Sequence, residues 1–213
     1  MYLIKTIAST DTTDPDYLAH GTVRHQVYVG EKRWIDPADA NDGRETDTYD
    51  HQSHLAVGYD VLGEGTPCGS IRNIYRGSLS LPIERHFEIE LDPTRAAIEV
   101  SRLAVPAPYR STLLMIGLCR WVYADATDNG VDDMYALVEL HLFRALNEIG
   151  FPFVKLAEPM AGVMGDPVMP IHCPVAEVLP GVARQDAAIR RRPLAPYFTR
   201  PFSEHLTDES VYQ

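Results

Sequence analysis

The sequence predicts an α/β protein, an α+β sandwich in which helices flank one mixed, mainly antiparallel sheet. Strand-like and helix-like patterns are interspersed, without the strict alternation of a doubly wound fold. The length of 213 residues suits one domain with a sizeable core. We therefore expect a single domain over residues 1–213, with an irregular tail from about residue 180, where prolines recur.

The expected strands are short runs of β-branched and other apolar residues between turn residues. In chain order they cover residues 1–8, 54–62, 68–75, 96–105, 133–138, 151–156 and 168–175. The second and third runs are separated by Gly63-Glu64-Gly65-Thr66-Pro67, which predicts a β-hairpin. The fourth run stops at Pro106, because proline cannot donate to a sheet ladder.

The expected helices have apolar residues at 3.6-residue spacing or recognisable start and stop signals. They cover residues 14–29, 111–126 and 139–148, with a short helix or turn over 81–87. Asp14 and Pro15 supply an N-cap and a first-turn proline for the first helix. The polar residues 30–50 form a long loop, and loops of this length often carry function.

The charge balance excludes several classes of function. The chain has 19 Lys and Arg against 30 Asp and Glu, a formal net charge of −11. This argues against general binding to nucleic acid or to anionic membranes. No apolar run approaches the roughly 20 residues of a transmembrane helix, and no secretory signal is visible.

The cysteines and the absence of familiar motifs narrow the chemistry further. Cys68, Cys119 and Cys173 show neither metal-binding spacing nor a disulfide framework, so we expect ordinary buried thiols in a reduced cytoplasmic protein. No GxGxxG, P-loop, GxSxG or HExxH sequence occurs. This weakens the dinucleotide, nucleotide, serine-hydrolase and zinc-protease interpretations.

The long loop ends in a cluster of carboxylates: Glu45, Asp47 and Asp50. Residues 36–50 carry six Asp or Glu against one Arg. One interpretation is a solvated acidic loop. A second adds His51 and His54 as metal ligands, but the spacing of a known site is missing, and we expect no metal. A third is a carboxylate set that orients a cation, or deprotonates an amine through water.

The predicted strand over residues 96–105 contains both Glu99 and Arg102. Regular alternation would place residues 98, 100, 102 and 104 on one face and 99, 101, 103 and 105 on the other. A charge is costly to bury alone, so both groups need partners. The acidic loop offers partners for Arg102, while Arg24 and Arg72 are candidates for Glu99. An ordinary structural ion-pair network is the alternative.

Together these residues resemble the signature of an acyltransferase superfamily. The superfamily contains the acyl-homoserine-lactone (autoinducer) synthases of quorum sensing, the long-chain N-acyl amino acid synthases and exosortase-associated acyltransferases. The matching residues are Arg24, Tyr28, Trp34, Glu45-Thr46-Asp47-Thr48-Tyr49-Asp50, Arg72, Phe87 and Glu99-Val100-Ser101-Arg102. The resemblance runs from about Arg24 to about Val178 and implies a GNAT-like fold.

The branch within this superfamily is read from finer features. Trp34 and Phe87 resemble the lactone synthases, but Tyr28 stands where those enzymes favour Phe. Residues 81–84 and 101–105 look more like the N-acyl amino acid synthase and exosortase-associated group. We therefore expect an N-acyl amino acid synthase. The alternatives are a lactone synthase that uses S-adenosylmethionine, and a non-catalytic sensor of an acyl carrier or lipid.

The resemblance implies acyl transfer from a thioester to an amine that is itself the nucleophile. A carboxylate then takes the amine proton, directly or through water, and Glu45 and then Glu99 are our candidates. Backbone N–H groups near Ala104 and Val105 would stabilise the oxyanion. We place Arg102 with the two catalytic carboxylates. The expected substrate-binding residues are Arg24, Tyr28, Trp34, Asp47, Asp50, Arg72, Phe87, Ser101, Ala104 and Val105.

The acyl donor is inferred from residues 106–113. GNAT enzymes that use coenzyme A usually hold its pyrophosphate there with a glycine-containing loop at a helix N-terminus. This segment has Arg110 but no glycine pair. We expect the co-substrate to be an acyl-phosphopantetheine thioester on an acyl carrier protein, with acyl-CoA as the alternative, and no tightly bound cofactor. The expected basic docking surface consists of Arg110, Arg120, Arg144 and Arg190–Arg192.

Overall fold

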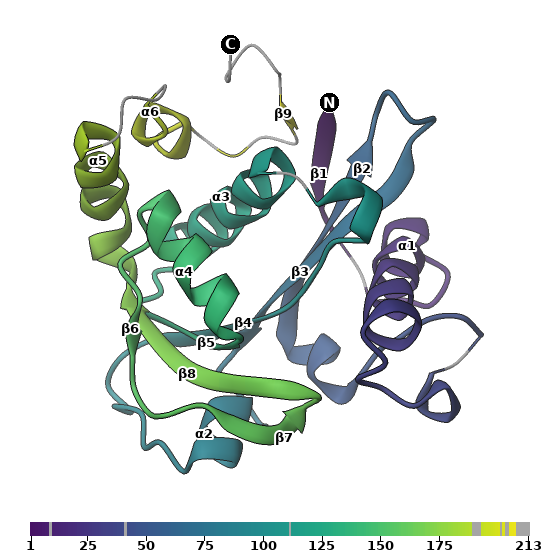
Figure 1. Cartoon of the computed structure of the whole chain (residues 1–213), viewed down its shortest axis with the longest axis horizontal. Coiled ribbons are helices and arrows are strands. Elements are labelled where there is room, and N and C mark those ends of the chain that lie inside the picture. Colours follow the sequence, from purple (N-terminus) through teal and green to yellow (C-terminus); the bar gives the residue numbers. More distant parts are fainter. Residues whose placement is uncertain are drawn as a thin grey trace. The chain divides into compact units, whose positions relative to one another are not determined.

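The computed structural model, drawn in Figure 1, describes residues 1–8, 10–40, 42–110, 112–188, 193–200, 202 and 205–207. These residues form two compact units. The first contains residues 1–74, 101–122 and the described part of 202–212, and the second contains residues 75–100 and the described part of 123–201. No helix in the described part of the chain is long and apolar enough to cross a membrane.

The sheet of the first unit is antiparallel. Strand β1 (Tyr2–Thr6) pairs with β2 (Ser53–Asp60) on one side and with β9 (His205–Thr207) on the other. Strand β2 pairs with β3 (Thr66–Tyr75), which confirms the predicted hairpin. The last residues of β4 (Ala97–Ala104) lie beside β3 and complete this part of the sheet.

The helix predicted from Asp14 forms, but it changes its winding. The α-helix α1 (Pro15–Arg24) begins at the Asp14 N-cap, whose carboxylate accepts the backbone N–H of Asp16 at 2.8 Å. It then continues as the π-helix η1 (His25–Glu31). π-helical turns are rare overall, and those that do occur are often found at functional sites. Here the π-helix carries Tyr28.

Helix α3 (Thr112–Asp128) packs closely on the sheet of the first unit. Its Leu114 and Leu118 are fully buried, and a Cβ at Gly69 would lie 3.3 Å from a methyl of each. The absence of a side chain there allows the helix to approach the strand. Trp121 anchors the helix further, because its indole N–H donates to the Thr6 hydroxyl at 2.9 Å.

The second unit contains the parallel strand pair that makes the sheet mixed. The first half of β4 pairs in parallel with β5 (Asp133–Val138), and β5 pairs antiparallel with β8 (Asp166–Pro174). Strand β8 also pairs with β6 (Val154–Lys155) and β7 (Met160–Met164). The sequence patterns missed β7, and the strand expected over residues 151–156 shortens to the two residues of β6.

Four helices described in the second unit are α2 (Pro82–Phe87), α4 (Leu140–Ile149), α5 (Val178–Ala188) and α6 (Ala195–Phe198). Helix α4 packs on β8 and on α5. Helices and a mixed, mainly antiparallel sheet confirm the predicted fold class.

The prediction of an irregular tail from about residue 180 is wrong for residues 180–188 and 195–198, which are helical. Residues 189–192, 201, 203–204 and 208–213 of the tail lie outside the described part of the chain. Residues 178–188 form α5, in which Pro180 lies in the first turn, where a missing backbone N–H breaks no helical hydrogen bond. Asp186 then accepts the backbone N–H of Ala195 at 2.7 Å and so links α5 to α6. Phe198 of α6 is buried against Phe151, with ring centroids 5.6 Å apart.

Candidate active site

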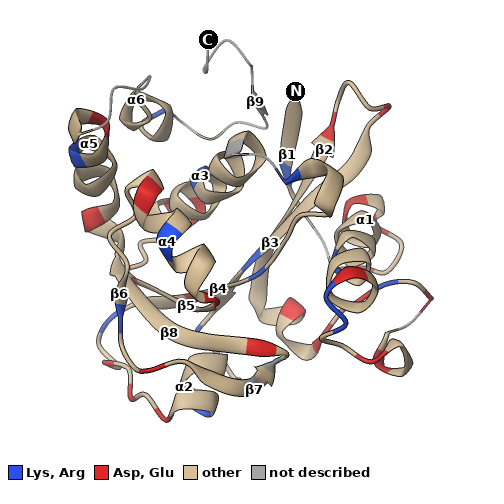
Figure 2. Ribbon diagram, in the orientation of Figure 1, with Lys and Arg blue, Asp and Glu red and all other residues tan. Residues whose placement is uncertain are grey.

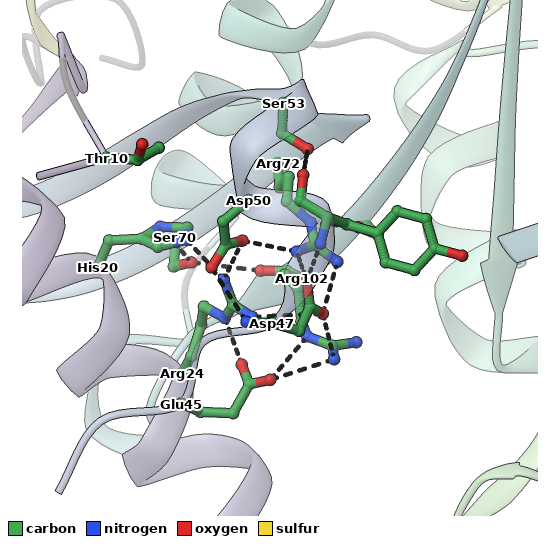
Figure 3. A network of polar contacts seen from close by, with 12 residues as sticks. Thr10, His20, Arg24, Glu45, Asp47, Asp50, Ser53, Ser70, Arg72 and Arg102 are labelled. Atoms are coloured by element: carbon green, nitrogen blue, oxygen red, sulfur yellow. Dashed lines mark hydrogen bonds and ion pairs between the residues drawn. The ribbon is translucent and has the colours of Figure 1, made fainter. Parts of the chain in front are cut away.

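Three arginines and three carboxylates meet inside the first unit (Figure 3). They come from α1, from the long loop and the 3₁₀ turn η3 (Thr48–Gln52) that ends it, from β3 and from β4. We call this group the arginine–carboxylate cluster. Its members are Arg24, Arg72, Arg102, Glu45, Asp47 and Asp50.

Arg24 is the most deeply buried cation of the cluster, with no exposed surface. Its Nε donates to Glu45, and its Nη1 donates to Asp50 Oδ1 at 2.8 Å. The loop is held against α1 by its backbone as well, because the Glu45 N–H donates to the Gly21 carbonyl at 3.0 Å. A Cβ at Gly21 would meet the Arg44 side chain at 3.3 Å, so this glycine lets the loop approach the helix.

Arg72 binds two carboxylates at once. Its Nη1 donates to Asp47 Oδ1 at 2.5 Å and to Asp50 Oδ1 at 2.6 Å, and its Nη2 donates to Asp47 Oδ2 at 3.0 Å. The two-pronged contact with Asp47 is the strong fork geometry that arginine alone provides. Its Nε donates to the Ser101 hydroxyl at 3.0 Å, so Arg72 also reaches β4.

The local sequence explains why Asp47 and Asp50 lie side by side. Asp47 is the N-cap of η3 and accepts the Tyr49 N–H at 2.9 Å, while Asp50 accepts the Asp47 N–H at 3.2 Å. This reciprocal capping box fixes both carboxylates on one turn before any arginine is considered. Figure 2 shows acidic segments in red along the loop that follows α1.

Arg102 breaks the regular geometry of β4. Its φ of 54° lies in the left-handed region, which costs a non-glycine residue roughly 1–2 kcal/mol. The prediction that residues 101 and 102 face opposite ways is therefore wrong, because both side chains reach the cluster. Arg102 Nη2 donates to Glu45 Oε1 at 3.1 Å and to Asp47 Oδ2 at 2.9 Å. The predicted pairing of Arg102 with the acidic loop is confirmed.

Two aromatic residues border the cluster. The Tyr28 hydroxyl donates to the Leu103 carbonyl at 2.9 Å, and burial raises the pKa of Tyr28 to about 12, so the phenol stays protonated. Trp34 stacks on Tyr28 with ring centroids 5.8 Å apart. The Arg102 guanidinium lies 5.6 Å from the Tyr28 ring centroid, which joins this aromatic pair to the cluster.

The cluster is electrically balanced, with three positive and three negative groups. Burial acts to raise the pKa of Glu45, but the charges of Arg24 and Arg102 outweigh it and hold that pKa below its usual value. The same opposition lowers the pKa of Asp47 and of Asp50. All three carboxylates are ionised at neutral pH, the form in which a carboxylate can accept a proton.

The structure also adds residues that sequence reasoning missed. The buried His20 contacts Arg24 Nη1 through Nε2 at 3.1 Å and the Ser70 hydroxyl through Nδ1 at 2.9 Å. The Tyr17 hydroxyl donates to Asp50 Oδ2 at 3.3 Å. Their spacing in the sequence could have indicated them. Tyr17 and His20 lie on the same helix face as Arg24. Ser70 is two residues before Arg72, so both lie on the same face of the strand.

Glu99 does not pair with Arg24 or Arg72 as predicted. It is buried in the second unit, where its Oε2 accepts the backbone N–H of Ile83 at 2.7 Å. Ile83 lies in the first turn of α2, whose N–H groups have no helical partner and attract a carboxylate. The two arginines bind the loop carboxylates instead. Phe87, the last residue of α2, is half-buried in this unit.

The alternative metal interpretation finds no arrangement to support it in this part of the chain. Asp47 and Asp50, its two carboxylates, are occupied by guanidinium groups. His51 and His54 have exposed side chains. Among the described residues, no group of three or more His, Cys, Asp and Glu side chains is placed to hold a metal ion.

The expected basic docking surface is corrected at one position. Arg120 is buried, and its guanidinium lies 5.3 Å from the centroid of the Phe202 ring, so it cannot present charge to a partner. Arg110 is half-exposed but binds Glu31 at 2.5 Å. Arg144 is exposed on α4. Arg190–Arg192 lie outside the described residues.

The mixed sheet with its flanking helices, and the buried cluster, fit the GNAT-like acyltransferase fold that the sequence predicts. The family model of the N-acyl amino acid synthase FeeM matches residues 19–174 of the chain. The protein therefore belongs to the FeeM N-acyl amino acid synthase family and is an acyltransferase. No curated protein matches its sequence.

Solved structures of this superfamily share the fold. FeeM, an N-acyl amino acid synthase from uncultured soil microbes, is 16% identical with a TM-score of 0.66, covering 85% of this chain and 94% of FeeM. The CoA-dependent acyl-homoserine lactone synthase BjaI is 21% identical with a TM-score of 0.66, covering 82% and 84% of the two chains. The lactone synthase LasI is 12% identical with a TM-score of 0.69, covering 89% and 95%.

Proposed function

We propose that this acyltransferase moves a fatty acyl group from an acyl carrier protein thioester to the amine of an amino acid, in the cytoplasm. The observation that carries the proposal is the match to the N-acyl amino acid synthase family over residues 19–174. That range contains every member of the cluster and spans both structural units. It also supports treating the two units as one catalytic domain.

The proposed reaction needs no nucleophile from the protein. The acceptor amine attacks the thioester carbonyl, a C–N bond forms, the C–S bond breaks, and the amine proton ends on the departing thiol. Glu45, or Glu99 as second candidate, receives that proton through a water molecule on the way. Backbone N–H groups near Ala104 and Val105 stabilise the oxyanion.

The exposed edge of the cluster is where polar substrate groups would meet it. The Arg102 side chain is 15% exposed and that of Asp47 is 24% exposed, whereas Arg24, Arg72 and Asp50 are exposed by at most 1%. The buried members hold the two outer ones in place. We therefore propose that Arg102 and Asp47 contact the substrate, and that Tyr28 and Trp34 line the substrate site beside them.

The carrier-protein donor is proposed from the segment after β4. Residues 107–109 form a short 3₁₀ turn, and Arg110 is tied to Glu31 and to the Val105 carbonyl at 3.1 Å. Phosphopantetheine on a carrier protein has no adenosine pyrophosphate, so it does not require the missing glycine pair. Purified enzyme given matched acyl-CoA and acyl-carrier thioesters should consume the carrier thioester faster.

The acceptor is tested by product analysis. The enzyme is incubated with acyl-carrier thioester and either a mixture of amino acids or S-adenosylmethionine, and the products are identified by mass spectrometry. We expect an N-acyl amino acid. An acyl-homoserine lactone accompanied by methylthioadenosine would overturn the proposal and establish the second candidate.

That second candidate, a lactone synthase using S-adenosylmethionine, is favoured by one observation. Trp34 stacks on Tyr28 beside the cluster, and Trp34 is a residue by which the chain resembles the lactone synthases. A sensor function without turnover is separated from both by Glu45→Gln. Loss of thioester consumption in the folded variant would show that the protein is a catalyst. A wild type that consumes no thioester, with a variant that differs from it only in binding affinity, would show that the protein is a sensor.

A further inference from the structure

A buried histidine and a buried serine lie beside the cluster, and the serine contacts the backbone of β4 (Figure 3). His20 and Ser70 both have no exposed surface. The His20 Nδ1 lies 2.9 Å from the Ser70 hydroxyl, which in turn lies 3.3 Å from the Arg102 carbonyl oxygen. The proposed reaction gives these two residues no task, so their burial together requires an explanation.

The direction of each hydrogen bond follows from Arg24. A guanidinium can only donate, so His20 Nε2, at 3.1 Å from Arg24 Nη1, must accept and carry no proton. The imidazole is then neutral with its proton on Nδ1, which donates to the Ser70 oxygen. The Ser70 hydroxyl is left to donate to the Arg102 carbonyl.

The neutral imidazole that this order requires is also the form its surroundings favour. Burial, and next the charge of Arg24, lower the pKa of His20 to about 3. The Ala56 carbonyl lies 3.4 Å from the same Nδ1 and accepts in the same sense. The series of hydrogen bonds from Arg24 to the Arg102 carbonyl therefore keeps one donor-to-acceptor direction at neutral pH.

This series of hydrogen bonds ends at Arg102, whose backbone is strained. Arg102 has a φ of 54°, and a non-glycine residue stays in that region only where its surroundings hold it. The side chain of Arg102 is held by Glu45 and Asp47, and its carbonyl by Ser70. The next carbonyl, of Leu103, is held by Tyr28.

We propose that His20 and Ser70 are positioning residues: Ser70, oriented by His20, holds the left-handed backbone at Arg102 and so sets the direction of Leu103–Val105. This inference rests on the proposed function, in which the N–H groups of Ala104 and Val105 stabilise the oxyanion. Turning those groups away lowers the rate of the chemical step and leaves ground-state binding of the amino acid unchanged.

The kinetic test compares Ser70→Ala with Ser70→Thr. We expect Ser70→Ala to lower kcat about 10- to 100-fold with the KM for the amino acid unchanged, because small misplacements of reacting groups have effects of this size. Ser70→Thr keeps the hydroxyl and should recover most of the rate. The matched control is Ser53→Ala, since the Ser53 hydroxyl also donates to a backbone carbonyl, that of Tyr49, at 2.5 Å. It should retain wild-type kcat.

A second measurement does not depend on activity. In ¹⁵N-labelled protein, Ser70→Ala should shift the amide resonances of Arg102, Leu103 and Ala104, whereas Ser53→Ala leaves them in place. Long-range ¹H–¹⁵N spectra of the wild type should show His20 protonated on Nδ1 only.

The outcomes separate the inference from the proposed function. An active wild type whose folded Ser70→Ala variant keeps full kcat, or a His20 protonated on Nε2, overturns the inference. A wild type that acylates no amine, combined with the predicted amide shifts, overturns the proposed function and leaves the positioning of β4 standing.

Discussion

Individual charged residues, each unfavourable to bury alone, form a charge-balanced group in this protein. Arg24 and Asp50 have no exposed side-chain surface, yet each has an opposite charge within 2.8 Å. The cluster contains equal numbers of cations and anions, so the charges of its three carboxylates are balanced. The other acidic residues of the loop, Asp36, Asp39 and Asp42, are exposed. Three of the acidic residues that make the sequence negative belong to this cluster, and three arginines from α1, β3 and β4 complete it.

Removing one charge from this group should strongly destabilise the protein. Asp50→Asn leaves Arg24 and Arg72 buried with less compensation, and we expect unfolding free energy to fall by about 3–5 kcal/mol. Urea denaturation measures the change. The control is Asp42→Asn, since Asp42 is 90% exposed and 3.8 Å from Arg44, and it should leave stability unchanged. Equal stability of the two variants would contradict the role of the cluster.

His20 predicts a distinct dependence of stability on pH. Its pKa is near 6.5 in the unfolded chain and about 3 when folded, so the unfolded chain binds the proton first. Stability is therefore lost as pH falls from 6.5 towards 3. Between pH 7.5 and 5.0 the loss should be about 2 kcal/mol greater in the wild type than in His20→Gln.

Denaturation at these two pH values separates His20 from the cluster carboxylates. Their folded pKa values are lowered, so their stabilisation is present above their unfolded pKa, near 4, and is lost only at lower pH. Parallel pH profiles for the wild type and His20→Gln would show that His20 is protonated in the folded protein.

At the scale of elements, helix ends and strand irregularities decide where side chains point. Asp14 starts α1 and Gly150 ends α4, as local sequence signals predict. The left-handed residue in β4 carries no such signal, because an arginine in a β-like run gives no reason to expect positive φ. The π-helix at residues 25–31 is likewise absent from the sequence pattern.

Two glycines that end helices should differ in their tolerance of alanine. Gly150 has a φ of 113°, and a Cβ there would lie 2.6 Å from Val182 Cα and 3.0 Å from the Gly181 carbonyl. We expect Gly150→Ala to lower unfolding free energy by about 3 kcal/mol, combining backbone strain with overpacking.

The matched control is Gly130→Ala, at the end of α3. Gly130 has a φ of 65°, and apart from its two neighbours in the chain no residue has an atom within 4 Å of the position of its Cβ. Only backbone strain applies, about 1 kcal/mol. Thermal unfolding of both variants gives the comparison, and a larger loss in Gly130→Ala would show that the close approach of α4 and α5 is wrong.

At the scale of the whole molecule, both structural units contain buried cysteines. Cys68 and Cys119 are buried in the first unit and Cys173 in the second, and none is in a disulfide. Burial raises the pKa of each thiol to about 12. The expectation of ordinary buried thiols is confirmed.

These thiols should be inert in the folded protein. A thiol reacts as its thiolate, so neither unit should consume a disulfide reagent such as DTNB at pH 8 within minutes. In denaturant all three cysteines should react. A fast-reacting thiol in native buffer, identified by peptide mass spectrometry, would show that its unit opens.

Much of the fold was predictable because its signals are local. The hairpin of β2 and β3, strand β5 and helices α1, α3 and α4 follow from apolar periodicity and turn residues. The tail was mispredicted, because Pro180 reads as a helix breaker unless its place in a first turn is known. Strand β7 has weak local preference, and its pairing with β8 defines it.

The sequence by itself determined the fold class, the family and the members of the arginine–carboxylate cluster, since these depend on residue types and their spacing. Only the tertiary structure decided how the charges pair, that Glu99 accepts from α2, that Arg120 is buried, and that His20 and Ser70 stand behind Arg102. Pairing depends on which strands and helices bring distant residues within about 3 Å, and hydrogen bonds act only over that distance.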